Sequence, residues 1–151
     1  SCGLGKELIN LAKLDQITGF SLPNNSLPWF ALFSAQPEKL PEHLSEQTTI
    51  GQMKQGLEWL EELDTKHFSF EKDTCGNHAE KERRLGIQLS RIGIQHAISL
   101  LQPSTQLPRT DKMDQELVQE FQDIWLLRAR RGGLHEAVDL LEKALQKTNR
   151  A

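Results

Sequence analysis

The segment from Asn77 to Gln102 places the strongest constraint on how this chain can fold. Its apolar residues recur at helical spacing, but they form a stripe that is wide for one buried face. Pro103 ends the predicted helix, because proline cannot continue the hydrogen-bond ladder. A long helix with so wide an apolar arc suits neighbours on two sides. The apolar residues are Leu85, Leu89 and Ile92, together with Ile87, Ile94, Ile98 and Leu101.

Two glycines interrupt this helix. Gly86 and Gly93 are seven residues apart and therefore lie on one helix face. Each glycine destabilises a helix interior by about 1 kcal/mol relative to alanine. Close approach of another helix would explain them.

The rest of the chain is also helical in pattern, and strand alternation is almost absent. Pro37 and Pro41 predict an irregular segment over residues 36–46 with at most one helical turn. Gly132-Gly133 predicts a tight corner between the last two helices. The other predicted helices cover residues 4–18 (ending at Gly19), 28–33, 49–64, 111–131 and 134–147. The predicted fold class is all-α, a single bundle of about five or six helices over residues 1–151.

The composition of the chain excludes several classes of partner. The 151 residues, with 37% hydrophobic and 26% charged side chains, are typical of one globular domain. The net charge of −3 argues against a nucleic-acid partner. No apolar run approaches the roughly 20 residues that span a bilayer, and the start does not resemble a signal peptide. We therefore expect no membrane partner and a cytoplasmic location. The first residue is not methionine, so we expect a piece of a longer multidomain protein.

Reactive side chains are few. His67, Cys75 and His78 come nearest to a metal-binding group, but no fourth histidine or cysteine is nearby in sequence, so no metal site is predicted. A nucleophilic Cys75 with His78 as its base is the alternative to a plain loop cysteine, which we favour. The chain contains neither a P-loop nor a dinucleotide-binding fingerprint, so we expect no cofactor.

Paired carboxylates could indicate glycosidase chemistry, which uses two of them across a sugar. Glu58 and Glu62 are four residues apart and would share a helix face. The helix carries an apolar stripe on its opposite face. We therefore interpret these carboxylates as a solvated surface and predict no catalytic residue in this chain.

Two groups of residues are candidates for a partner surface. The first is a cluster of large aromatic side chains in a short segment, for which core packing is the favoured role and a partner surface the alternative. The second is a set of arginines near the end of the helix over 111–131. Helix capping and pairing with carboxylates is the simpler role for these arginines. The candidate interface residues are Trp29, Phe30, Phe33, Arg128, Arg130 and Arg131.

The stretch Asp123-Ile124-Trp125-Leu126-Leu127-Arg128-Ala129-Arg130-Arg131-Gly132-Gly133-Leu134 resembles a "W-L-x-R-N-R-x-G-G-L" pattern. This pattern is typical of bacterial β-N-acetylhexosaminidases of glycoside hydrolase family 20, near their C-terminus. The stretch from Leu14 to Asn24, with its Leu-Pro-Asn turn, is similar to the same family. The chain as a whole resembles the C-terminal helical domain of the subgroup typified by streptococcal N-acetylglucosaminidases. Ala129 stands where the pattern has asparagine.

The resemblance implies an accessory domain rather than an enzyme. In this family an Asp-Glu pair in a TIM barrel assists the substrate's own acetamido group. A barrel takes about 250 residues, and this chain has neither that length nor the strands. The resemblance therefore implies a helical domain that packs on the catalytic barrel and takes part in forming a homodimer.

Two other function classes stay open. One is a free-standing α-helical interaction module unrelated to glycosidases. The other is a small enzyme that uses Cys75.

Overall fold

The computed structural model describes most of the chain. The described residues are 13–19, 27–34, 36–44, 49–65, 76–103, 109–128 and 132–148. Residues 13–18 are helical. The later helices are α2 (Leu27–Phe33), the 3-10 helix η1 (Pro37–Lys39), α3 (Leu40–His43), α4 (Ile50–Thr65), α5 (Gly76–Leu101), α6 (Asp111–Arg128) and α7 (Leu134–Thr148). No strand occurs in these ranges, so the all-α prediction is confirmed.

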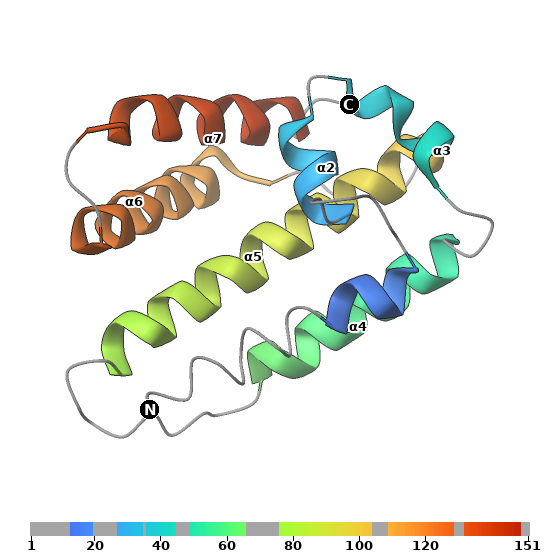
Figure 1. Ribbon diagram of the computed structural model, residues 1–151, viewed down its shortest axis with the longest axis horizontal. Helices are drawn as coiled ribbons and strands as arrows, with labels where there is room; N and C mark the ends of the chain where they lie inside the picture. Colours follow the sequence, from blue (N-terminus) through green and yellow to red (C-terminus); the bar gives the residue numbers. More distant parts are fainter. Residues whose placement is uncertain are drawn as a thin grey trace.

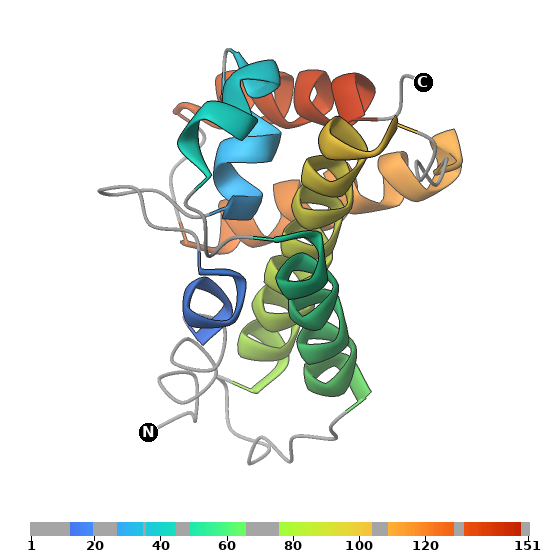
Figure 2. The same cartoon turned by 90° about the vertical axis from the view of Figure 1, so that its right-hand side faces the viewer.

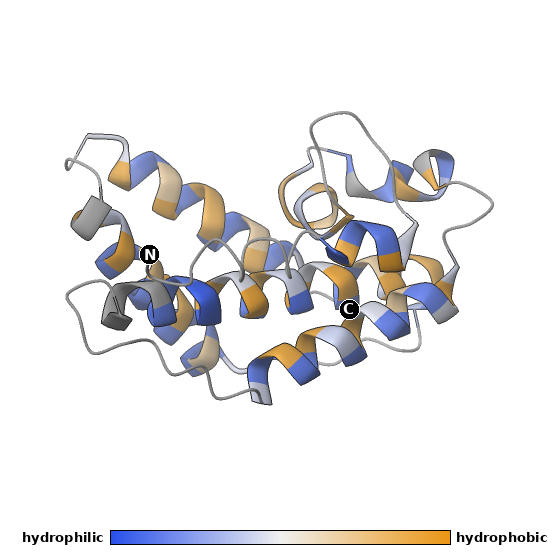
Figure 3. Cartoon of the chain, turned by 60° about the horizontal axis from the view of Figure 1, so that its bottom comes forward, coloured by the Kyte–Doolittle hydropathy of each residue, from blue (hydrophilic) through white to orange (hydrophobic). Residues whose placement is uncertain are grey.

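The long helix α5 runs through the middle of the bundle, as its wide apolar stripe predicts. Figures 1 and 2 show α4 alongside one part of α5, with α6 and α7 together on the other side. Every long helix carries both apolar and polar bands (Figure 3), which is the pattern of helices packed on one another. The two groups of apolar residues on α5 enter two different clusters of buried side chains.

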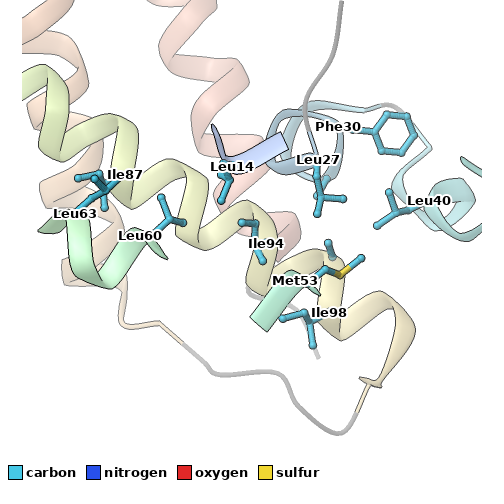
Figure 4. Close-up of a cluster of buried hydrophobic side chains, with 12 residues drawn as sticks. Leu14, Leu27, Phe30, Leu40, Met53, Leu60, Leu63, Ile87, Ile94 and Ile98 are labelled. Carbon is cyan, nitrogen blue, oxygen red and sulfur yellow. The ribbon is translucent and has the colours of Figure 1, made fainter. Parts of the chain in front are cut away.

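The first cluster joins α5 to the N-terminal half of the chain. Figure 4 shows its side chains converging from α2, α4 and α5. From α5 it takes Ile87, Ile94, Ala97 and Ile98. Its other members are Leu14, Leu27, Phe30, Ala31, Leu40, Met53, Leu60 and Leu63.

The second cluster joins α5 to the last two helices. It takes the other apolar group of α5, namely Leu85, Leu89 and Ile92. Leu117 of α6 and Leu141, Ala144 and Leu145 of α7 complete it from the C-terminal side. Leu32 also belongs to this cluster, so the short helix α2 contributes to both halves of the core.

Gly93 lets α2 lie directly against α5. A Cβ atom added at Gly93 would lie 2.5 Å from the carbonyl oxygen of Pro28 and 2.6 Å from its Cα. Real Cβ atoms do not approach backbone atoms that closely. The close approach predicted from the sequence is therefore confirmed at Gly93, and the neighbour is the first turn of α2.

The segment after α2 is more helical than the sequence prediction. We predicted at most one turn over residues 36–46, but η1 is followed directly by α3. Pro41 lies in the first turn of α3, where its missing N–H has no intrahelical partner to lose. The prediction was wrong because both prolines occupy positions at which a helix tolerates them.

Thr49 and Gln52 form a reciprocal cap at the start of α4. The Gln52 N–H donates to Thr49 Oγ1 at 3.2 Å, and the Thr49 N–H donates to Gln52 Oε1 at 2.8 Å. Two backbone donors that the helix leaves without intrahelical partners are thereby satisfied.

We expect Thr49→Ala to lower the free energy of unfolding by about 1 kcal/mol, because the N–H of Gln52 loses its acceptor. Urea denaturation followed by circular dichroism measures this change. Thr49→Ser is the control, since it keeps the hydroxyl and should retain nearly all the stability. Equal stability of the alanine and wild-type chains would contradict the capping role.

Candidate functional site

The structure separates the three aromatic candidates on α2. Trp29 is 44% exposed. Its ring meets that of half-buried Phe33 edge-on, with centroids 5.5 Å apart and an interplanar angle of 65°. Phe30 is only 9% exposed and belongs to the first core cluster. Trp29 and Phe33 are thus the aromatic residues of α2 that reach the surface.

The predicted corner between the last two helices is present. Gly133 has a φ of 80°, a left-handed conformation that glycine adopts without strain. Its carbonyl accepts the first hydrogen bond of α7, from the Ala137 N–H at 3.0 Å. A Cβ added at Gly133 would lie 3.5 Å from Cζ2 of Trp125, so the tryptophan ring packs over the corner.

The predicted arginine group can be placed only in part. The helix α6 ends at Arg128, whereas Arg130 and Arg131 lie outside the described residues. His67 and Cys75, the centre of the metal and nucleophile alternatives, also lie outside them. Among the residues whose side chains are described, no group of three or more histidine, cysteine or acidic side chains could hold a metal ion.

The carboxylates of α4 lie on the solvent face. Glu58, Glu61 and Glu62 are all exposed. Glu61 accepts a hydrogen bond of 3.1 Å from Arg91 of α5, which also lies 3.6 Å from Asp64. This arrangement matches the surface role expected from the sequence.

A buried polar network that was not predicted lies where α5, α7 and the segment before α6 meet. Arg109 is its centre. The Arg109 Nε donates to Asp114 Oδ1 at 2.8 Å, and Nη2 donates to the Leu145 carbonyl at 2.9 Å and to Thr148 Oγ1 at 2.8 Å. The side chains of Arg109 and Asp114 are only 11% and 18% exposed. One guanidinium therefore ties the start of α6 to the end of α7.

Lys147 makes a second tie, between α7 and α2. Its Nζ donates to the carbonyl oxygens of Leu32 at 3.0 Å and Ser34 at 3.1 Å. These carbonyls belong to the C-terminal end of α2, where cations are favoured. Burial lowers the pKa of Lys147, and the negative charge of Glu38 opposes that shift.

His96 of α5 is the titratable side chain of this region. It is 8% exposed, and its Nε2 has no hydrogen-bond partner among the described residues. Burial, with smaller contributions from the charges of Lys147 and Arg109, lowers the pKa of His96 to about 4. The imidazole is therefore neutral at pH 7.

The network does not have the geometry of a nucleophile and base. The Ser99 hydroxyl donates to the His96 carbonyl at 2.7 Å, and His96 Nδ1 lies 3.5 Å from that hydroxyl oxygen. A general base needs to be within about 3.2 Å of the proton it takes.

The sequence contained one signal of this network. His96 follows Leu89 and Ile92 by seven and four residues, so it lies on the apolar face that enters the second cluster. The roles of Arg109 and Lys147 could not be predicted from the sequence, because their hydrogen-bond partners are distant in sequence.

Two concavities border the C-terminal helices. One, of about 260 Å³, lies between α5 and α6 and is lined by Arg91, Arg109, Gln88 and Gln95 among others. The other, of about 600 Å³, is an open groove between α6 and α7 with Asp111, Asp114 and Glu142 on its walls. Their walls carry charged and amide side chains.

No protein family, curated protein or solved structure matches this chain. The described part of the chain lacks a helix with both the length and the apolar character needed to cross a bilayer. The class established by the fold is an all-α helical bundle.

Proposed function

We propose that this chain is the non-catalytic C-terminal domain of a bacterial β-N-acetylglucosaminidase of glycoside hydrolase family 20. It packs on the catalytic barrel of that enzyme and contributes to a homodimer. The observation that carries the proposal is the corner segment over residues 123–134. Its sequence resembles the family pattern, and its tryptophan ring lies over its second glycine, Gly133.

The surface proposed to meet the barrel contains Trp29 and Phe33. Tryptophan is enriched among the residues that dominate binding energy at interfaces. The other side of α2 lies against α5 at Gly93 and contributes to both core clusters. The aromatic pair therefore lies on a helix that is packed against the core, and such packing limits the entropy lost on binding.

Hydrolysis belongs to the barrel under this proposal, and the helical domain acts through packing. The enzyme would be cytoplasmic, and neither nucleic acid nor membrane would be a partner. The free-standing interaction module remains the alternative, and the experiment below separates the two.

The test combines this chain with the segment encoded upstream of Ser1 in the same reading frame, produced separately. We expect the two to form a stable complex, and a chromogenic N-acetylglucosaminide to be hydrolysed by the upstream segment but not by this chain. Trp29→Ala should weaken the complex at least tenfold. Met113→Ala is the matched control, because Met113 is 53% exposed on α6, outside the proposed surface.

Two results would overturn the proposal, and a third would exclude its contact surface. A reading frame without a barrel upstream would favour the free-standing module. Hydrolysis by this chain alone would assign it chemistry of its own. Equal binding by the Trp29→Ala and wild-type chains would exclude the proposed contact surface.

A further inference from the structure

We propose that the junction of α2, α5 and α7 around His96 is an acid-operated latch, in which protonation of the imidazole releases the C-terminal half of α7. The proposal is independent of the function proposed above. It rests on the burial of the ring, on its unpartnered nitrogen and on two fixed cations.

The first observation is that the buried ring has no acceptor for the second N–H group that protonation would create. His96 is 8% exposed, and its Nε2 lies buried without a hydrogen-bond partner in the described structure. A neutral imidazole can leave one nitrogen unprotonated, whereas an imidazolium has two N–H donors that both need acceptors. Protonation in place would therefore bury a charge with an unsatisfied donor.

The second observation is that the charges acting on His96 are positive and anchored. Lys147 is held by the carbonyls of Leu32 and Ser34, and Arg109 by Asp114, the Leu145 carbonyl and Thr148. Neither cation can move away from the ring without breaking these bonds.

The carboxylates of the region are already engaged with those two cations. Asp114 of α6 is bonded to Arg109, and Glu38 of η1 favours the charged form of Lys147. Protonation of His96 adds a third positive charge to the junction. The repulsion among the three charges falls when the end of α7 moves away, because this takes Lys147 with it and admits water to the ring.

The direction of the pH effect follows from proton binding. In the closed junction the pKa of His96 is about 4, whereas a solvated imidazole has its ordinary value of about 6.5. Between these values the open state binds more protons, so the closed state loses stability as the pH falls through this window. The opening equilibrium should rise about 20-fold between pH 7 and pH 5.

The test is amide hydrogen exchange of the full chain, followed by NMR at pH 7 and pH 5 and corrected for the intrinsic exchange rate. We expect the protection of the amides from Leu141 to Leu145 to fall about 20-fold, while those of α4 keep their protection. His96→Leu should remove this pH dependence. Exposed His135, at the start of α7, gives the control, and His135→Gln should behave as wild type.

A direct titration needs no variant. The ring protons of His96 in the wild-type chain should shift with a midpoint well below pH 6. A midpoint near 6.5 would overturn the proposal. So would α7 protection that does not change between pH 7 and pH 5, that falls equally in His96→Leu, or that is lost together with the protection of α4.

Discussion

Gly93→Ala should lower the free energy of unfolding by about 2–3 kcal/mol, although alanine is the better helix former by about 1 kcal/mol. The added methyl would lie 2.5 Å from the Pro28 carbonyl oxygen and 2.7 Å from its Cβ. The nearest atoms are backbone, so no side-chain rotation can relieve the overlap. The helix α2 would have to move away from α5, which loosens both core clusters. Denaturant unfolding measured by tryptophan fluorescence tests this expectation.

Gly51→Ala is the matched control for this substitution. Gly51 also lies in a helix, but it is exposed, and a Cβ there would be 3.6 Å from Thr49 Oγ1, an ordinary contact. Its change to alanine should leave stability unchanged or raise it by up to about 1 kcal/mol. If both alanine variants were equally stable, α2 would not be seated on Gly93 as described.

Arg109→Met should destabilise the chain by about 3 kcal/mol. The substitution keeps an apolar side chain of similar length but removes three hydrogen bonds. It leaves the Asp114 carboxylate, which is only 18% exposed, without its cation. Removing one partner of a largely buried ion pair costs more than the pair contributes, because the remaining charge stays desolvated. Thermal and urea denaturation both measure the loss.

Arg91→Met is the comparison for this second substitution. Arg91 pairs with Glu61 and Asp64, but its side chain is 29% exposed and the Glu61 side chain is 66% exposed. Solvent screens such a pair, so we expect a loss of at most about 1 kcal/mol. Equal losses in the two methionine variants would show that the Arg109 network contributes no more than a surface ion pair.

The helical bundle could be predicted because its main signal is local. The two apolar groups of α5 lie within one continuous segment, and their periodicity alone predicts neighbours on two sides. The end of the helix over residues 13–18 at Gly19 and the start of α7 after Gly133 depend equally on a few adjacent residues.

The polar network could not be predicted because its partners are far apart in sequence. Arg109 reaches a carbonyl 36 residues away, and Lys147 reaches carbonyls 115 and 113 residues away. No periodicity relates such positions, and each residue alone is typical of a solvent-exposed surface. The position of His96 on the apolar face of α5 indicated its burial, but its two cationic neighbours, Lys147 and Arg109, are far away in sequence and were not indicated.

The bond between Lys147 and α2 also has a consequence for biosynthesis. The helix α2 is synthesised more than a hundred residues before Lys147, whose side chain binds the C-terminal end of α2. Until α7 emerges, the apolar face formed by Leu32, Leu89 and Ile92 has no cover from that helix. The first core cluster contains no residue of α7 and can assemble before that helix is made, whereas the second needs Leu141, Ala144 and Leu145 of α7. We therefore expect nascent chains to pass through a partly folded stage in which this apolar face is not yet covered by α7.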